Sequence, residues 1–407
     1  MQHNEVLSPT MLNRWLTEKT LAGAGEAEIV GGFCERLVQM GMPLARAIVL
    51  VDTLHPIYEG RAFRWNRGAA QAEVVAYGRT REGANAEAWR RSPLYYMVET
   101  NQSVLHRRLT DPAPSDEIPD FPSFAELREE GMTDFIGLVT RFAPAGVIGE
   151  VEAIYSFWTS NIVSGFDENH MAMLETLIKP LAAALKCASL AGIAATLVET
   201  YLGRDAGRRV LSGRIERGVA EQISAVLWYS DLRGYTRITD TAAPDEIIPL
   251  LNDYAEVVIS AIHAAGGDVL KLIGDGTLAI FREPDIGEAS RAALNAAVAI
   301  RQDAAELNLR RANARLPLTE VYLGLHVGEV FYGNVGSPDR LDFTVVGPAV
   351  NEVSRIAAMC RSAERDVLLS AAFVDASHLA DRHRLVSVGR YALRGIAQAQ
   401  ELYTLEK

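Results

Sequence analysis

Two aspartates, Asp231 and Asp275, are the residues whose type and surroundings could most directly do chemistry. Asp231 closes the apolar run 225–231, and Asp275 lies in the Gly-Asp-Gly turn of segment 266–281, which has the pattern of a hairpin. A carboxylate at the end of a buried strand is costly unless it is paired or binds a metal. Either aspartate alone could be an ordinary turn or helix-cap residue. If the hairpin pairs with the first strand, the two carboxylates meet and suit Mg²⁺ with a phosphate substrate.

Two further segments carry polar residues at regular spacing. Segment 321–336 is predicted to be another hairpin, and segment 340–360 leads into a helix whose first turn contains Pro348. Asn351 and Arg355 are four residues apart, so they share one face of that helix. The buried side of the helix is predicted to consist of Val350, Val353, Ile356 and Ala357.

In this order, the segments 225–236, 266–281, 321–336 and 340–360 resemble the class III adenylyl/guanylyl cyclase family over about residues 221–405. The resemblance implies a ferredoxin-like or palm catalytic domain of the α+β class. Rival phosphate-binding patterns are missing from the sequence: it has no GxxxxGK[ST] and no strand-linked GxGxxG. The run 266–270 is similar to the signature of diguanylate cyclases, but the residues around it follow the class III pattern.

The resemblance also implies roles for particular residues. Asp231 and Asp275, with the backbone carbonyl of Leu232, would hold two Mg²⁺ or Mn²⁺ ions per site. Asn351 would position the ribose, and Arg355 would stabilise charge on the α-phosphate. The implied reaction is an in-line displacement in which the ribose 3′-hydroxyl is the nucleophile.

Two other positions are implied to read the purine base. Lys271 matches a lysine that donates to adenine, and Thr344 matches the second purine-reading position, where many members have Asp. Threonine there is typical of the class IIIb subgroup, some of whose members respond to bicarbonate. Guanylyl cyclases typically carry Glu and Cys at these positions. The pair therefore favours ATP as substrate and cyclic AMP as product, with guanylyl cyclase as the alternative.

The triphosphate contacts depart from the family pattern. Some members have a basic residue where this chain has Tyr322. Arg394 matches a family lysine or arginine and is the expected replacement. Arg340 could equally contact phosphate or be an ordinary surface charge, and Asp342 is expected to be structural.

In this family the site forms between two chains, so a homodimer is expected and a monomer should be inactive. Asp231 and Asp275 of one chain would face Lys271, Thr344, Asn351 and Arg355 of the other. A degenerate, non-catalytic regulatory module is a further alternative. Such a module should have lost at least one of the metal or catalytic residues, and this chain retains all of them.

The N-terminal part, residues 1–185, is predicted to be a separate regulatory domain that opens with a helical segment. Its order of helix, strands and closing helix resembles a GAF domain over about 28–187, which implies a small-molecule ligand or dimerisation. The closing helix would start after Asp167, which is a plausible N-cap. The other predicted elements are a helix at 28–40, strands at 45–52, 62–66, 134–142 and 149–158, and a loop at 110–123.

Residues 186–220 are predicted to be a helical connector between this domain and a catalytic domain at 221–407. An apolar stripe at helical spacing could pack against a second copy or against its own domain, and we expect a dimerisation helix. The glycines within 203–218 predict that the helix breaks into turns before the next strand. The stripe consists of Leu181, Leu185, Leu190, Ile193, Leu197 and Leu202.

Bulk properties exclude several classes of function. The 407 residues carry a net charge of −12, which disfavours nucleic acid or an anionic membrane as a partner. The three cysteines form no metal-binding pattern. The N-terminal residues lack the apolar core of a signal peptide, and run 181–198, interrupted by Lys186, is expected to fall short of a membrane span. A cytoplasmic, soluble protein is therefore expected.

Overall fold

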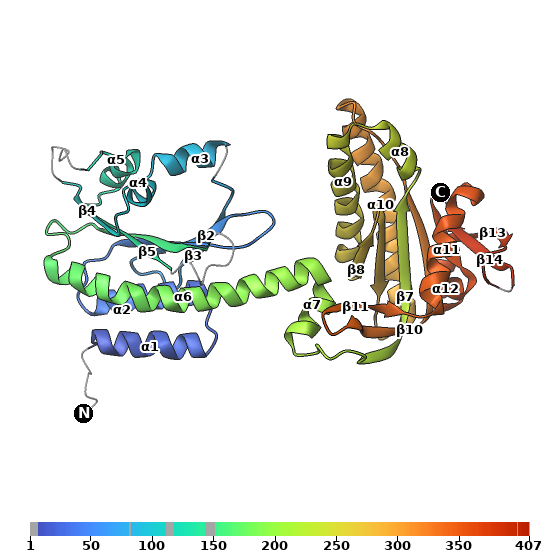
Figure 1. Cartoon of the computed structure of the whole chain (residues 1–407), viewed down its shortest axis with the longest axis horizontal. Helices are drawn as coiled ribbons and strands as arrows, with labels where there is room; N and C mark the ends of the chain where they lie inside the picture. Colours follow the sequence, from blue (N-terminus) through green and yellow to red (C-terminus); the bar gives the residue numbers. More distant parts are fainter. Residues whose placement is uncertain (1–6, 81–82, 111–117, 143–150, 397, 407) are drawn as a thin grey trace. The chain divides into compact units, whose positions relative to one another are not determined.

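The computed structural model describes residues 7–80, 83–110, 118–142, 151–396 and 398–406. The chain divides into two units, Met1–Leu197 and Val198–Lys407 (Figure 1). Both units combine helices with a β-sheet, so the fold is of the mixed α/β kind expected from the sequence.

The N-terminal unit is built on a six-stranded antiparallel sheet with the order β3-β2-β1-β6-β5-β4. Its strands are β1 (Arg46–Asp52), β2 (Gly60–Asn66), β3 (Glu73–Tyr77), β4 (Val104–Arg108), β5 (Asp134–Arg141) and β6 (Ala153–Ser160). Its helices are α1 (Pro9–Leu21), α2 (Glu26–Gln39), α3 (Gly83–Arg90), α4 (Pro93–Glu99), α5 (Pro122–Glu129) and the start of α6 (Glu168–Leu202).

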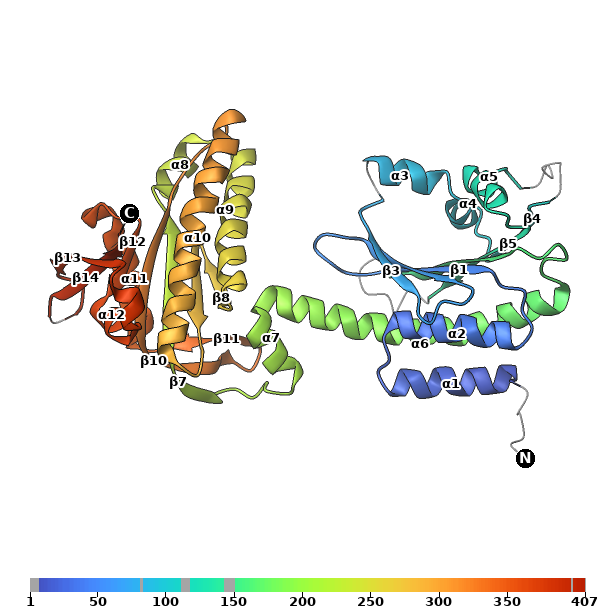
Figure 2. The same ribbon diagram turned by 180° about the vertical axis from the view of Figure 1, so that it is seen from behind.

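Side chains along β1 point alternately to the two faces of the sheet, and helices cover both faces. Ala47, Val49 and Val51 are buried and belong to a core with α1, α2 and α6. The opposite face is covered by α3, α4 and α5, as Figures 1 and 2 show. The strands and helices that the sequence predicted here are present, whereas β3, β4 and α3–α5 were not predicted. Residues 111–117 of the predicted loop and 149–150 of the predicted last strand lie outside the described residues.

Helix α6 corrects two expectations about the connector. It runs without a break from Glu168 to Leu202, so the predicted closing helix and the connector helix are one element. Asp167 accepts the backbone N–H of His170 at 2.8 Å and caps its start, as predicted. Leu181 and Leu185 are fully buried in the core of their own unit. They are therefore not available to pack against a second copy of the chain, as the apolar stripe was predicted to do.

A sharp joint follows α6. Gly203 has φ +86°, and a Cβ atom added there would lie 2.3 Å from the carbonyl oxygen of Val269. Helix α7 (Arg204–Leu211) begins at once and packs against the sheet of the C-terminal unit. The side chain of Asp205 accepts a hydrogen bond from Tyr332 at 2.9 Å and pairs with Arg209 at 2.7 Å.

The C-terminal unit is built on a sheet with the order β13-β14-β12-β10-β7-β9-β8, and β11 pairs with β10. Its strands are β7 (Ala220–Leu232), β8 (Asp268–Ile273), β9 (Gly276–Phe281), β10 (Val321–Ser337), β11 (Arg340–Val346), β12 (Val367–Ser370), β13 (Leu385–Tyr391) and β14 (Gln400–Leu405). Its remaining helices are α8 (Tyr235–Thr241), α9 (Pro244–Ala264), α10 (Ile286–Asn313), α11 (Pro348–Ala363), α12 (Ala371–Ala376) and α13 (Leu379–Arg382).

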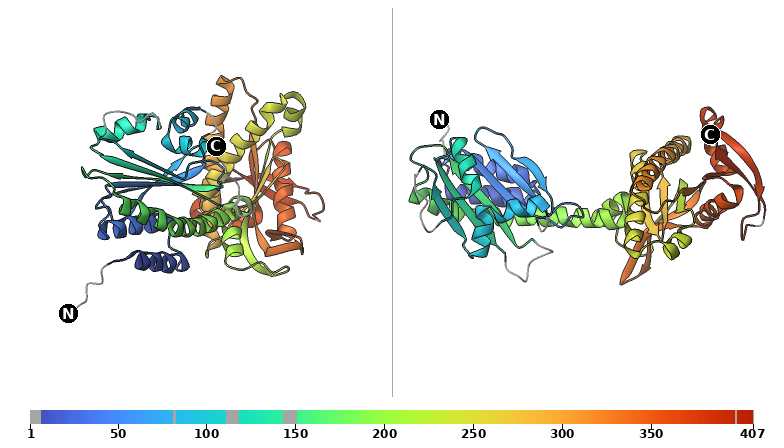
Figure 3. Two further views of the ribbon diagram at one scale, coloured as in Figure 1. Left: turned by 60° about the vertical axis from the view of Figure 1, so that its left-hand side comes forward. Right: turned by 90° about the horizontal axis from the view of Figure 1, so that it is seen from above.

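Different helices pack against the two faces of the central strands β7 and β10. Val226 and Trp228 pack with α9 and α10, whereas Ala225 and Leu227 pack on the side of Val353 from α11. These layers can be followed in the view from above in Figure 3. Each strand therefore ends between two helical layers, which is where Asp231 lies.

The prediction of a hairpin within 321–336 is wrong, because β10 is one continuous strand over Val321–Ser337. Its glycines serve close packing instead of a turn. A Cβ atom at Gly324 would lie 2.6 Å from the Val353 carbonyl oxygen, and one at Gly328 would lie 2.6 Å from the Ala349 Cβ atom. The hairpin is instead the one that β10 forms with β11.

Two helices, α6 and α9, are long and apolar enough to cross a membrane when judged by length and composition alone. For α6 this differs from the expectation that 181–198 falls short of a span. Both helices contribute residues to the cores, such as Leu181 and Tyr254, and the core helix of a soluble protein passes the same test.

Candidate functional site

The hairpin β8–β9 brings the two aspartates together. Strand β9 pairs with β7 so that Thr277 lies opposite Ser230, the residue before Asp231. Asp275 occupies the turn of the hairpin, and its Oδ2 atom accepts the backbone N–H of Leu232 at 3.2 Å. The predicted meeting of the carboxylates is therefore observed.

The electrostatics of this pair suit a cation. Burial, and secondarily the charge of Asp275, raises the pKa of Asp231 to about 6. Burial and both carboxylates also raise the pKa of Tyr229, which lies beside them. Two adjacent carboxylates that repel one another are a hard oxygen donor set, so these residues fit Mg²⁺ or Mn²⁺. A cavity of about 170 Å³ adjoins them and is closed on one side by residues of α9, including Leu251 and Tyr254.

Lys271 and Thr344 come close to one another within one chain. The Lys271 ammonium forms an ion pair with the carboxylate of Asp342 on β11. Thr344 is two residues further along β11 and therefore lies on the same face of that strand. Thr344 is buried. Asp342 was expected to be structural, and its contact identifies it as the ionic partner of Lys271.

Asn351 and Arg355 lie on one face of α11, which begins at Pro348 as predicted. Asn351 is exposed and Arg355 is half-buried. A Cβ atom at Gly395 would lie 3.4 Å from Nη2 of Arg355, so this guanidinium lies against the loop that carries Arg394. On the buried side of the helix, Val350 is only partly covered.

The carboxylates and the start of α11 occupy different ends of the same sheet face. The first turn of α11 contacts Gly328, which pairs with Ala225 of β7. Asp231 lies six residues further along β7, and at ~3.3 Å per residue this is about 20 Å. One chain thus holds Asn351 away from its own carboxylates.

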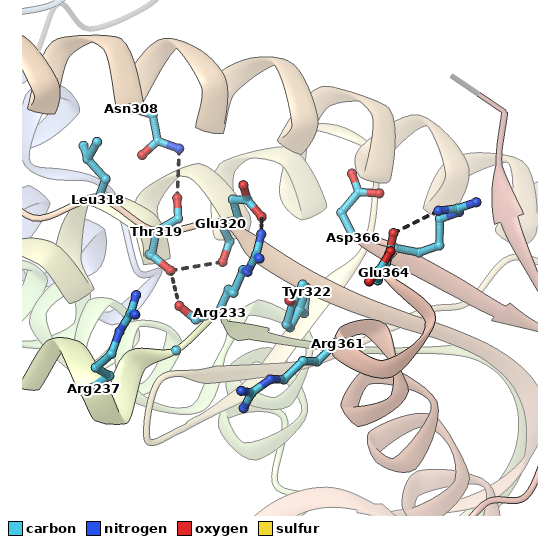
Figure 4. Close-up of a pocket in the computed structure, with 12 residues that line it drawn as sticks. Arg233, Arg237, Asn308, Leu318, Thr319, Glu320, Tyr322, Arg361, Glu364 and Asp366 are labelled. Atoms are coloured by element: carbon cyan, nitrogen blue, oxygen red, sulfur yellow. Dashed lines mark hydrogen bonds and ion pairs between the residues drawn. The ribbon is translucent and has the colours of Figure 1, made fainter.

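A cavity of about 940 Å³ opens beside the carboxylate end of β7 (Figure 4). Tyr322 lies opposite Asp231 in the antiparallel pair of β10 and β7, so both side chains lie on one face. Four arginines contribute to the cavity. The lining is Arg233, Gly234, Arg237, Asn308, Leu318, Thr319, Glu320, Tyr322, Arg361, Glu364, Arg365 and Asp366.

The arginines of this cavity differ in how they are compensated. Arg233 pairs with Glu320 at 2.5 Å, and Arg365 donates to the backbone carbonyl of Glu364 at 3.0 Å. Among the described residues, Arg237 and Arg361 form no ion pair. Burial raises the pKa of Tyr322, and the charges of Arg233 and Arg361 oppose that rise. The cavity therefore presents uncompensated positive charge next to the carboxylates.

Sequence reasoning did not single out Arg361. It lies in the last turn of α11, where a basic residue is normally explained by the helix dipole. The two arginines that sequence reasoning did select are both exposed. Arg394 lies in the turn before β14, and Arg340 is the first residue of β11. Neither lines the large cavity.

A second set of side chains could hold a metal ion, away from this site. The ligand atoms of Asp285, Glu288 and His378 lie within 4.8 Å of one another. The two carboxylates are exposed, and His378 is within 3.4 Å of both. Exposed acidic groups of this kind are common without a metal, so we assign no function to them.

Comparison with known proteins agrees with the geometry of the C-terminal unit. Residues 219–407 match the family model described as "Adenylate and Guanylate cyclase catalytic domain". An adenylate cyclase of Anabaena cylindrica is 34% identical over 160 residues, which are 39% of this chain and 32% of that protein. An uncharacterised protein of Mycobacterium tuberculosis is 32% identical over 211 residues, 50% of this chain and 37% of that protein.

Solved structures of cyclases also align with part of this chain. The adenylyl cyclase CyaB from P. aeruginosa has a TM-score of 0.42 and 21% identity, over 46% of this chain and 96% of that one. The chain spans about a third of the length of the curated relatives it matches. The match to the family model, together with the paired carboxylates, identifies residues 219–407 as an adenylate and guanylate cyclase catalytic domain.

Proposed function

We propose that this protein is an adenylyl cyclase, which converts ATP to 3′,5′-cyclic AMP and pyrophosphate. The observation that carries the proposal is the proximity of Asp231 and Asp275, whose charges interact, inside a domain that matches the cyclase family. A non-catalytic cyclase-fold module would have no reason to keep two mutually repelling carboxylates at the end of a central strand.

Asp231, Asp275 and the carbonyl oxygen of Leu232 would hold two divalent cations. When bound, Mg²⁺ or Mn²⁺ ions lower the pKa of a coordinated hydroxyl and neutralise phosphate charge. The half-buried position of Asp231 keeps the carboxylates fixed before substrate arrives, which reduces the reorganisation that catalysis requires.

Asn351 would orient the ribose and Arg355 would stabilise charge on the α-phosphate. Because Asn351, in the first turn of α11, is about 20 Å from the carboxylates along the strand direction, it would be supplied by a second chain. Arg355 lies on the same helix face and would come from that chain too. The proposed active form is therefore a homodimer in which each site combines Asp231 and Asp275 of one chain with Lys271, Thr344, Asn351 and Arg355 of the other.

Lys271 and Thr344 would read adenine. The hydroxyl of Thr344 can accept a hydrogen bond from the adenine amino group, and the Lys271 ammonium can donate to a ring nitrogen. Asp342 fixes the position of Lys271 through their ion pair. Guanylyl cyclase stays the alternative, and the class IIIb-like Thr344 makes bicarbonate an activator to be tested.

The triphosphate would lie against the arginine-lined cavity. Tyr322 cannot supply a positive charge, but Arg361 lies next to it and has no acidic partner among the described residues. A guanidinium with free donors is suited to bind phosphate oxygens at two points. Arg394 would add a contact, because the loop that carries it lies beside Arg355. Arg340 could equally contact phosphate or be an ordinary surface charge.

The N-terminal unit would act as a GAF-like regulatory domain. Its signal would reach the catalytic unit through α6 and α7, and Asp205 ties α7 to the sheet through Tyr332 of β10 and Arg282, which follows β9. The proposed setting is the reducing cytoplasm, because Cys34, Cys187 and Cys360 are all free thiols.

The proposal is tested by measuring turnover of ATP and GTP by the full-length protein with Mg²⁺ or Mn²⁺. Cyclic AMP should be the main product, and cyclic GMP as the main product would overturn the base assignment. Adding bicarbonate at constant pH in the same assay tests the Thr344 inference, which predicts an increased rate.

A mixing experiment tests the shared site. The variants Asp231→Ala and Arg355→Ala should each be inactive. When they are mixed, dimers with one chain of each variant should form. In such a dimer one of the two sites has all its residues, so activity should return. If mixing restores no turnover while both variants still dimerise, the shared-site proposal is wrong.

A further inference from the structure

The N-terminal unit contains a cavity of about 600 Å³ between its sheet and helices α3 and α4. This volume lies within the range of small-molecule sites. The sheet supplies residues of β1, β2, β3 and β6, and the helices supply the opposite wall. The lining is Ile48, Leu50, Asp52, Glu59, Ala62, Arg64, Val75, Tyr77, Gly78, Thr80, Asn85, Ala88, Trp89, Ser92, Leu94, Tyr95, Val98, Glu152, Tyr155 and Phe157.

The sheet side of this cavity is acidic. Asp52 Oδ1 accepts the hydroxyl of Tyr77 at 2.6 Å, and Glu59 accepts both the N–H and the hydroxyl of Thr80. Asp52, Glu59 and Glu152 are close enough to repel one another. Burial, opposed by the Tyr77 hydrogen bond and reinforced by the two glutamates, raises the pKa of Asp52 to about 7. Among the described residues of the lining, Arg64 is the one basic side chain, and it is exposed.

Aromatic rings line the cavity from both its helices and its sheet. Trp89 of α3 contacts Tyr155 edge-on, with ring centroids 5.6 Å apart, and contacts Tyr95 at 6.0 Å. Ring faces attract cations, and flat apolar bodies pack against them. Among the described residues, no ion pair to a basic side chain involves Asp52, Glu59 or Glu152, and the rings favour a cation.

We propose that this cavity binds a small organic cation, an arylalkylamine, with its ammonium against Asp52 and its ring packed on the cavity side of Trp89 and Tyr155. An ammonium has three donors, and Tyr77 occupies only the Oδ1 atom of Asp52. A bound cation removes the mutual repulsion of the three carboxylates, whereas an anionic ligand would add to it. The proposal does not depend on the reaction of the catalytic unit.

A charge series of ligands tests the proposal on the unaltered full-length chain. The probes are phenethylamine, phenethyl alcohol and hydrocinnamate, which are close in size but are cationic, neutral and anionic at pH 8. Calorimetric titration should show that the amine binds about tenfold more tightly than the alcohol, since a charge-assisted hydrogen bond is gained. Hydrocinnamate should not bind. Equal affinity for the three probes, or no binding of the amine, would overturn the proposal.

Three variants locate the site. Asp52→Asn should remove the preference for the amine over the alcohol, and Trp89→Leu should weaken both ligands. Glu35→Gln is the matched control, because Glu35 is exposed on α2, which covers the other face of the sheet. An unchanged amine preference in folded Asp52→Asn protein would place the ligand elsewhere and contradict the proposal.

Discussion

Two of the cavities in this molecule, one in each unit, lie beside neighbouring carboxylates, but their surroundings differ. In the C-terminal unit, Asp231 and Asp275 adjoin a cavity with four arginines. In the N-terminal unit, Asp52 and Glu59 adjoin a cavity lined by Trp89, Tyr95 and Tyr155. Burial and a neighbouring carboxylate raise the pKa of one acid in each pair, to about 6 for Asp231 and about 7 for Asp52.

The difference teaches that a carboxylate pair alone does not specify its ligand. Beside guanidinium groups, the pair suits a metal ion that carries an anionic phosphate chain, since each charge has a counterpart. Beside aromatic rings, the same charge suits an organic cation with an apolar body. A variant that changes a residue of one cavity and leaves the other cavity intact tests this difference.

The largest effect is expected from the carboxylates of the catalytic unit. Asp275→Asn should lower turnover on the order of 10³-fold, since an amide cannot supply the anionic oxygen that a divalent cation requires. The measurement is cyclic AMP formation at saturating ATP with Mg²⁺ and with Mn²⁺. Asp303→Asn, at an exposed position on α10, is the control and should leave turnover unchanged. Activity of Asp275→Asn within a few-fold of the parent would contradict the proposed metal site.

A smaller effect is expected from the arginine cavity. Arg361→Gln should raise the KM for ATP about tenfold, because one charge-assisted contact to phosphate is lost. The variant should keep most of its kcat, since Arg361 is placed at the triphosphate end of the site. Arg310→Gln removes an exposed arginine of α10 outside the cavity and serves as the comparison. Should both variants show the same KM, the phosphate would be held by other residues.

The smallest effect is one of stability and concerns Asp52. Its native pKa of about 7 lies above its value in an unfolded chain. The native state therefore holds this proton more tightly, and the free energy of unfolding falls as pH rises from about 4 to about 7. Asp52→Asn removes that loss, so its Tm should exceed that of the parent by roughly 2–4 °C at pH 8 and by less at pH 5.

Thermal unfolding followed by circular dichroism at both pH values checks this prediction. Glu35→Gln, which changes an exposed acid, should show no such dependence on pH. A Tm difference for Asp52→Asn that is the same at pH 5 and pH 8 would show that its carboxyl is not perturbed in the native protein.

The carboxylate pair could be predicted from the sequence because its signals are local. A Gly-Asp-Gly turn between apolar runs specifies the β8–β9 hairpin within fifteen or so residues, and only its pairing with β7 is long-range. The placement of Asn351 and Arg355 on one helix face is also local, since it follows from helix periodicity. Their roles, and the dimer, remain predictions.

Features that depend on packing between distant segments could not be predicted. The glycines of β10 resembled turn residues, but they are there because α11 and residue Val219 approach the strand closely. Arg361 lies near the carboxylates because its neighbour Tyr322 is on β10, directly opposite Asp231 of β7. This long-range pairing cannot be read from the residues around Arg361. The N-terminal cavity combines Asp52 with Trp89 across the space between a sheet and a helix that the sequence did not predict.

The joint at Gly203 has a practical consequence for building hybrid proteins. Any larger residue at this position would bring a Cβ atom against the Val269 carbonyl and would need a positive φ that side chains disfavour. The segment that can be transplanted behind another sensor therefore begins at Gly203 and includes α7, well before the first catalytic strand. A fusion made at residue 220 would discard Asp205 and leave Tyr332 without its hydrogen-bond acceptor.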